Sequence, residues 1–216
     1  MRPRTTLLLP IALLYALFVS WYTDFGGPLS DEEITSYLTQ MKSRNGAAPE
    51  LLARIEKFMR EDTGRQFFML NAIDYNENPP DVEGAEPGET AEQLLGRYMA
   101  YMYPNLFKRA SHPIIAGPAA FTAMDLVGID NAEVWDMGAM MRYRSRRTFM
   151  EIVANHEMRG RHEFKVAALT KTIAYPVEAE INLGDPRGLV GLLLLAIYGL
   201  LEAFLPRKPV TAKSEG

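Results

Sequence analysis

The chain has 216 residues, a formal net charge of -4 at pH 7 and no cysteine. The lack of cysteine excludes disulfides, thiolate metal sites and a cysteine nucleophile, and the acidic balance gives no support to nucleic-acid binding. Both ends of the chain are apolar, and the part between them has the length of one ordinary domain. A domain of that size can bury a core without disulfides or metal.

The first predicted element is an apolar helix over residues 5–22, a stretch without any charged residue. About 20 apolar residues cross the hydrocarbon core of a bilayer, so we expect residues 1–26 to form a transmembrane anchor. Trp21 and Tyr22 stand where interfacial aromatic residues are common. A cleaved signal peptide is the alternative, but the bulky side chains near its end disfavour the small residues that cleavage requires.

A helical hairpin is predicted over residues 27–64. Ser30 and Glu33 have the spacing of a capping box, which starts the first helix, and residues 45–46 (Asn-Gly) are expected to end it. The second helix is expected to begin near Pro49. The hairpin is interpreted as a spacer that packs on the neighbouring domain, and a docking surface for a partner is the alternative.

Residues 65–180 are predicted to form one domain with four strands. The strands are expected at residues 66–75, 112–121, 133–143 and 171–178, and the helices after the capping residues Thr90 and Ser145. Gly117 and Pro118 should interrupt the second strand, and Pro104 should kink or restart the first helix. The order β-α-β-β-α-β predicts an α+β, ferredoxin-like domain with both helices on one face of an antiparallel sheet. The uncovered face predicts a homodimer.

The last predicted element is a second transmembrane helix over residues 188–205, within the segment 181–206. Glu202 is the only charged residue of residues 188–205. Basic residues lie outside both apolar segments and acidic residues lie between them. The positive-inside rule therefore predicts cytoplasmic termini in a bacterial inner membrane, with a periplasmic central domain. Residues 207–216 are expected to be a disordered cytoplasmic tail.

The central domain resembles a known family. The resemblance is carried by residues 67–71 (FFMLN), Tyr98, Tyr101, Gly117, the pair Trp135 and Asp136, and residues 142–153. These residues resemble the dimeric α/β-barrel superfamily, specifically an uncharacterised branch with a domain of unknown function. The superfamily includes cofactor-independent monooxygenases, haem-handling proteins and small lactone isomerases. The helical hairpin and the two membrane anchors depart from its usual small soluble members.

A pocket between the sheet and its helices is expected to be lined by Asn71, Tyr98, His112, Trp135, Asp136 and Arg142. In such a pocket His112 or Asp136 could act as a general base, and Arg142 or Asn71 could stabilise a developing oxyanion. Each residue also has a structural interpretation. Trp135 suits a core, Asp136 suits a cap or an ion pair, and His112 suits the start of a strand.

Arginine residues gather around residues 142–161. Arg146 and Arg147 follow the predicted cap Ser145, where free backbone amides and guanidinium groups together favour a small anionic or aromatic ligand. The alternative is a solvated charged face with intrahelical ion pairs, and anionic lipid headgroups are a third possibility.

No metal or cofactor is predicted. His156 and His162 do not have the one-turn spacing of a zinc-binding helix, and no glycine-rich nucleotide loop is present. Two functions remain. The first is a membrane-anchored accessory or small-molecule-binding protein that binds a small ligand or supports a larger membrane complex. The second is a membrane-tethered, cofactor-independent enzyme, monooxygenase- or isomerase-like, acting on a hydrophobic or anionic metabolite.

Overall fold

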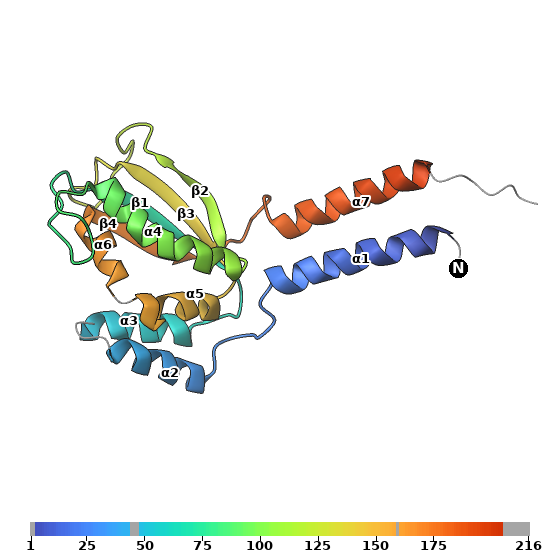
Figure 1. Ribbon diagram of the computed structural model, residues 1–216, viewed down its shortest axis with the longest axis horizontal. Helices are drawn as coiled ribbons and strands as arrows, with labels where there is room; N and C mark the ends of the chain where they lie inside the picture. Colours follow the sequence, from blue (N-terminus) through green and yellow to red (C-terminus); the bar gives the residue numbers. More distant parts are fainter. Residues whose placement is uncertain (1–2, 44–47, 159, 205–216) are drawn as a thin grey trace, which may run out of the picture. The chain divides into compact units, whose positions relative to one another are not determined.

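The computed structural model describes residues 3–43, 48–158 and 160–204 (Figure 1). The chain forms two compact units. One contains α1 (Pro3–Tyr22) up to Trp21 together with α7 (Pro186–Phe204), and the other is the domain Tyr22–Glu180. The hairpin and the sheet therefore belong to the same unit.

Helices α1 and α7 contact each other. The hydroxyl of Tyr15 donates a hydrogen bond of 3.1 Å to the carbonyl of Arg187, and a Cβ atom at Gly191 would lie 3.4 Å from the Tyr15 ring. A small residue at position 191 thus allows this close approach. By length and composition α7 is the one described helix suited to cross a membrane, with a mean hydropathy of 1.7 and no part of this stretch buried. The apolar stretch of α1, Leu7–Tyr22, is shorter.

The predicted hairpin consists of α2 (Asp31–Lys42) and α3 (Pro49–Arg60). The capping box is confirmed, because the Ser30 amide donates to Glu33 Oε2 at 2.8 Å and the Glu33 amide donates to Ser30 Oγ at 3.2 Å. The predicted end at residues 45–46 lies outside the described residues. The hairpin buries its apolar face together with α5, in a cluster formed by Leu29, Ile34, Leu38, Met41, Met59, Met150 and Ala154.

The turn after α3 requires glycine at position 64, where φ is +72°. A Cβ atom there would lie 2.6 Å from the carbonyl carbon of Gly27, which is backbone and cannot rotate away. Gly64→Ala is expected to destabilise the domain by about 2–3 kcal/mol through backbone strain and this clash. Gly84→Ala is the control, since Gly84 has a φ of +85° and the nearest atom to its added Cβ is a Phe164 side-chain carbon at 3.6 Å. Thermal unfolding of both variants should show the larger loss for Gly64→Ala, and equal losses would contradict the clash.

The domain contains an antiparallel four-stranded sheet in the order β2-β3-β1-β4. Its strands are β1 (Phe67–Tyr75), β2 (His112–Pro118), β3 (Met137–Tyr143) and β4 (Leu169–Val177). The first and last lie close to their predicted positions. The predictions for the middle pair were too long, because pairing stops at Pro118, which has no amide to donate, and resumes only at Met137. Residues 119–136 form a long connection, called here the β2–β3 loop.

Helices cover one face of the sheet (Figure 1). They are α4 (Ala91–Lys108), α5 (Arg146–Val153) and α6 (Arg161–Ala167), with a short 3₁₀ turn at His156–Met158. The core on this face includes Phe67 and Tyr143, whose rings stack at 5.2 Å, with Leu94, Leu106 and Ile152 packed in the same cluster. Helix α4 continues through Pro104 to Lys108, so no restart of this helix occurs. The chain therefore forms a mixed α+β domain with one covered and one open sheet face.

Candidate functional site

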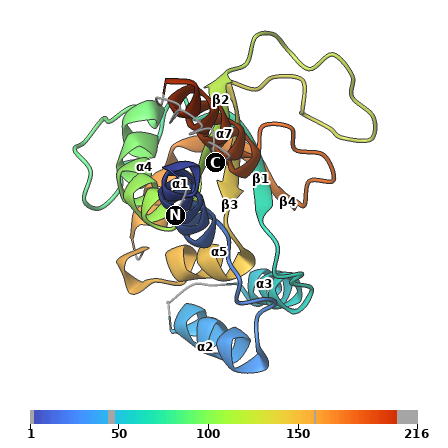
Figure 2. The ribbon, with the colours of Figure 1, turned by 90° about the vertical axis from the view of Figure 1, so that its right-hand side faces the viewer.

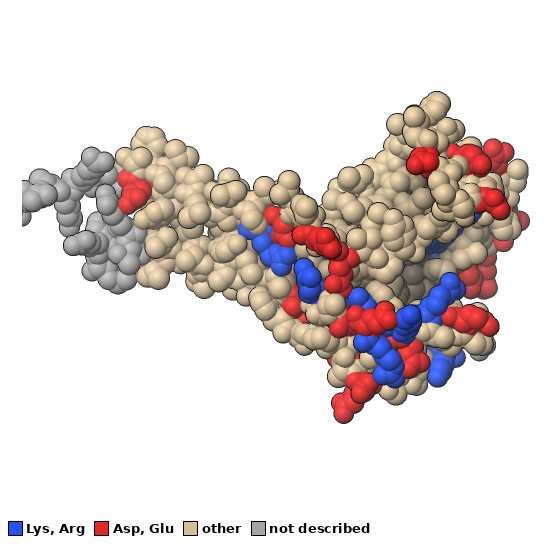
Figure 3. All heavy atoms as spheres, turned by 180° about the vertical axis from the view of Figure 1, so that it is seen from behind, with Lys and Arg blue, Asp and Glu red and all other residues tan. Residues whose placement is uncertain are grey.

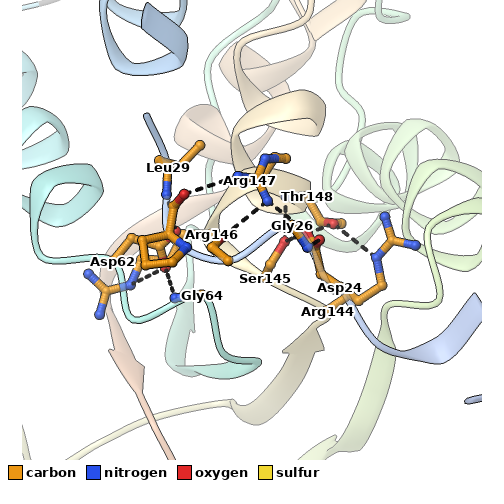
Figure 4. A network of polar contacts seen from close by, with 12 residues as sticks. Asp24, Gly26, Leu29, Asp62, Gly64, Arg144, Ser145, Arg146, Arg147 and Thr148 are labelled. Carbon is orange, nitrogen blue, oxygen red and sulfur yellow. Dashed lines mark hydrogen bonds and ion pairs between the residues drawn. The ribbon is translucent and has the colours of Figure 1, made fainter. Parts of the chain in front are cut away.

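The N-terminus of α5 holds the densest polar network in the domain (Figure 4). Ser145 caps the helix as predicted, because its Oγ accepts a hydrogen bond of 3.1 Å from the Thr148 amide. The same hydroxyl donates to Asp24 Oδ2 at 2.5 Å. Asp24 follows α1 closely in the chain and Ser145 lies 121 residues later. The cap of α5 thus fixes the segment that begins the domain.

Arg147 binds the same segment. Its Nε donates to Glu33 Oε1 at 2.6 Å and its Nη2 donates to Glu33 Oε2 at 3.2 Å, a two-pronged contact that a guanidinium group makes well. Its Nη1 lies 3.3 Å from Asp24 Oδ2 and also donates to the carbonyl of Gly27. Arg147 therefore joins α5 to the start of α2 and to the chain before it.

These contacts set the charge state of the network. The hydrogen bond from Arg147 lowers the pKa of Glu33 from its ordinary value of 4.5 to about 2. Burial raises the pKa of Asp24, but hydrogen bonds from Ser145 and Gly26 and the charge of Arg147 outweigh burial and lower it overall. The hydrogen bonds that Arg147 donates to Glu33 in turn raise the pKa of Arg147. Both carboxylates remain ionised at neutral pH.

Arg146 connects α5 to the other side of the hairpin. Its Nη2 donates to Glu178 Oε1 at 2.9 Å, its Nη1 donates to the carbonyl of Phe58, and its Nε lies 3.7 Å from Asp62 Oδ1. Asp62, whose side chain is 1% exposed, accepts hydrogen bonds from the amides of Leu29 and Gly64. Arg146 and Arg147 therefore both pair with acidic groups on other segments of the domain, which differs from the predicted alternative of ion pairs within one helix.

Arg142 is buried on the open face of the sheet, with 1% of its surface exposed. Its guanidinium lies 3.6 Å from the centre of the Tyr22 ring, and its Nη2 donates to the Tyr22 carbonyl at 2.9 Å. Its other nitrogens donate to Gln66 Oε1 at 2.8 Å and to the carbonyl of Ala110. Tyr22 is 2% exposed. Arg142 therefore stabilises the entry of the chain into the domain.

His112 lies beside Arg142 on the neighbouring strand. Its Nε2 is 2.7 Å from the hydroxyl of Tyr22, and its Nδ1 is 3.0 Å from the carbonyl of Pro113. Two of the three predicted catalytic residues thus come together, around Tyr22. Asp136, the third, is six positions before Arg142, and at about 3.3 Å per strand residue the two lie about 20 Å apart.

The other predicted pocket residues have separate surroundings. Asp136 Oδ2 accepts a hydrogen bond of 2.6 Å from the Tyr75 amide, and Trp135 Nε1 donates to the carbonyl of Ala132. Asn71 Nδ2 donates to the carbonyl of Met69 within β1. Tyr98 is buried in the core under α4, where burial raises its pKa to about 12. The predicted residues therefore do not surround one common pocket.

A wide hollow on the domain surface lies elsewhere. It has a volume of about 760 Å³, opens widely to solvent, and lies between α4, α6 and the loop before α4. Charged residues line it, including Arg97, Arg161 and Glu163. Arg97 Nε donates to both oxygens of Glu89, at 2.9 and 2.7 Å. Among the described residues no group of His, Cys, Asp and Glu is placed to hold a metal ion.

Sequence reasoning missed the partners of the three arginines. Tyr22 was interpreted as an interfacial aromatic residue and Glu33 as part of a capping box, and both Asp24 and Glu33 were counted among the acidic residues between the membrane segments. The capping residue Ser145 was the available clue, because it placed the arginines at a helix start where an acidic partner is favourable.

Figure 3 shows Lys and Arg beside Asp and Glu on the domain surface, with almost no charge on the surfaces of α1 and α7.

Comparisons with known proteins show the fold alone. No protein-family model matches the chain, and no curated protein matches it. Two solved structures of the RPA0582 protein match at 18% identity; one is described as a protein of unknown function from Rhodopseudomonas palustris and the other as its methylated form. Each match covers 64% of this chain. The first covers 98% of the other chain with a TM-score of 0.49, and the methylated form covers 96% with a TM-score of 0.50. This chain is thus similar in fold to an uncharacterised α+β protein.

Proposed function

We propose that this protein is a membrane-anchored accessory protein whose ferredoxin-like domain, of the dimeric α/β-barrel type, is displayed on the outer face of a bacterial inner membrane. Helices α1 and α7 serve as the two anchors. In α7 the leucines at 189, 192, 193, 195 and 200 are each more than half exposed, a surface that lipid would cover. The basic residues outside the two helices favour cytoplasmic termini.

The observation that carries this proposal is the polar network at the start of α5. Arg142, Arg146 and Arg147, the strongest candidates for binding a substrate, instead hold the chain segment after α1 and the hairpin against the sheet. A buried guanidinium with several internal acceptors is costly to expose, so these groups are poorly suited to release their partners for a ligand. The arrangement supports a rigid displayed module better than a catalytic pocket.

A second copy is the proposed cover of the open sheet face. The strand register places Ile115, Met140, Leu70 and Tyr175 in one row across the four strands. Ile115 is 63% exposed and Tyr175 is 50% exposed. A row of apolar side chains on an uncovered sheet face favours burial against a matching surface. A homodimer through this face would provide that surface, and a membrane complex is the proposed wider partner.

The enzyme alternative has less support. It requires a pocket in which His112, Asp136 and Arg142 converge. His112 and Arg142 instead both contact Tyr22, whereas Asp136 lies at the opposite end of β3 and accepts a hydrogen bond there. The open hollow beside Arg97, which both basic and acidic residues line, is another place where a small ligand could bind. A metabolite that co-purifies with the full chain at one molecule per chain would support this alternative over the accessory role.

The absence of natural cysteine allows a direct test of the anchors and their orientation. In the full chain in intact cells, Asn78→Cys, in the loop before α4, is expected to react with a membrane-impermeant maleimide. Lys213→Cys, near the C-terminus, is expected to react only after the membrane is broken, because the positive-inside rule places it in the cytoplasm. Labelling of both positions in intact cells, or release of the chain by alkaline carbonate, would contradict two anchors in this orientation.

A further inference from the structure

We propose that the β2–β3 loop is a dimerisation element: in each copy it packs against the partner's sheet and completes an interface that the open sheet face cannot form alone. The inference rests on the proposed homodimer and assigns a new element to it. The predicted strands at residues 112–121 and 133–143 left little room for such a loop.

The β2–β3 loop exposes far more apolar surface than an ordinary connection. Phe121 is 76% exposed, Met124 is 88% exposed and Val127 is 83% exposed, and Ile129 and Val134 are each 53% exposed. Unstructured loops longer than about 12–15 residues are uncommon in compact domains and are usually functional or disordered. Exposed apolar side chains gathered in one loop indicate a binding surface.

The base of the β2–β3 loop is fastened to the domain. The amides of Ala119 and Ala123 donate to the carbonyls of Asp136 and Glu133, both at 2.8 Å. Lys171, on β4, donates to the carbonyl of Asn131 at 2.7 Å. The loop stands out from the sheet in Figure 2. Because its base is already ordered, packing the tip against a partner costs less conformational entropy than ordering a free loop.

The size of the open face favours a contribution from the loop. Four strands about 4.8 Å apart and about seven residues long at about 3.3 Å each give a sheet face of about 440 Å². Tyr22 already covers the end that holds Arg142. A stable interface typically buries about 800 Å² on each partner. The accessible area of this face exceeds its flat outline, but part of the face is already covered, so the apolar loop is the adjoining surface that can bring the buried area towards that size.

Membrane anchoring selects the arrangement of the two copies. The register aligns His112, Arg142, Phe68 and Val177 at one end of the sheet. The chain enters the domain at this end, at Tyr22, and leaves it beyond Val177, whereas the β2–β3 loop lies at the other end. In the proposed dimer the two open faces stack about a two-fold axis that runs along the strands, so the ends at which both chains enter and leave lie together.

That axis determines what each loop contacts. Edge strand β2 of one copy then lies over edge strand β4 of its partner, because rotation about the strand direction exchanges the two edges of the sheet. The β2–β3 loop, which follows β2, reaches the partner's Ile173, a residue of the open face that is 40% exposed. The loop carries four acidic residues, Asp125, Asp130, Glu133 and Asp136, and no Lys or Arg, which disfavours an anionic lipid surface as its binding partner.

Site-specific photo-crosslinking in the full chain tests the inference. The photoreactive residue p-benzoylphenylalanine would replace Phe121 in the loop, Ile115 on the open face, or Phe107 on α4, which is 54% exposed and belongs to the helical layer. Two differently tagged copies would be expressed together in native membranes. The probes at 121 and 115 are expected to give a product of twice the chain mass that carries both tags, and the probe at 107 is not.

The three probes separate the possible failures. A dimer product at 115 without one at 121 would overturn the role of the loop and leave the sheet dimer standing, whereas loss of both would overturn the dimer as well. A product at 121 with a different protein or with lipid would also overturn the inference. The double variant Phe121→Asp with Met124→Asp should weaken self-association by about tenfold or more, because both side chains would lose buried apolar surface. Unchanged self-association would contradict it.

Discussion

Replacing Arg142 with methionine is expected to destabilise the domain by about 3–5 kcal/mol. Methionine keeps most of the apolar stem but removes every donor. The carbonyls of Tyr22 and Ala110 and the Gln66 side chain then lose the hydrogen bonds that Arg142 gives them in a buried place. Each buried acceptor left unsatisfied costs about 1–3 kcal/mol, and the contact of the guanidinium with the Tyr22 ring is lost as well.

Thermal unfolding of the full chain in detergent measures this effect. Arg54→Met, at an exposed position of α3, is the matched control and should change stability by no more than about 0.5 kcal/mol. The Arg142 variant should also become sensitive to protease after Trp21, because Tyr22 loses its main contact. If the two variants had equal stability, Arg142 would not hold the start of the domain, and its role as a ligand-binding residue would return.

Acidification is the second condition with a large expected effect. The pKa of Glu33 is lowered from 4.5 to about 2, so the unfolded chain binds a proton at this site more readily than the folded chain. The resulting stability is fully present above pH 4.5 and is lost as the pH falls towards 2. Glu33 has a side-chain exposure of 34%, so solvent screening reduces the expected loss to about 1–2 kcal/mol.

Arg147→Gln should remove this pH dependence, because Glu33 loses the guanidinium that lowers its pKa. It should also lower stability at neutral pH by about 2–3 kcal/mol, because the Asp24 side chain is only 11% exposed and loses its cationic partner. Unfolding by denaturant at pH 2.5, 3.5, 4.5 and 7 measures both effects. Lys57→Gln is the control, since its ion pair with Glu61 is 75% and 63% exposed and should contribute little. A variant at position 147 that kept the same slope between pH 2.5 and 4.5 would contradict the assignment to Glu33.

Local sequence patterns predicted the elements well. The spacing of Ser30 and Glu33, and of Thr90 and Gln93, predicted two capping boxes that the structure contains. Strand β1 lies within one residue of its predicted start because its apolar run is bounded clearly. The middle strands were predicted too long, since residues 119–136 are rich in apolar side chains and a sequence pattern cannot distinguish a paired strand from an apolar loop.

The candidate site could be predicted less well than the fold. Arg142 and Asp136 are on strands or next to them in the predicted order, but their separation along β3 keeps them about 20 Å apart. Arg146 and Arg147 were correctly placed at a helix start, and what they contact there depends on segments that lie between 32 and 123 positions away in the chain. Such contacts follow from tertiary packing, which neither charge nor periodicity in a local window contains.

The contact between Tyr22 and Arg142 has a consequence for the order of events during synthesis. The two residues are separated by 120 positions in the chain. At a translation rate of about 5–20 residues per second, Arg142 is made about 6–24 s after Tyr22. Throughout that interval Tyr22, at the start of the domain, is without the strand that fixes it. The domain therefore cannot be completed before β3 has been synthesised. Tyr22, at the start of the domain, forms its final contacts late.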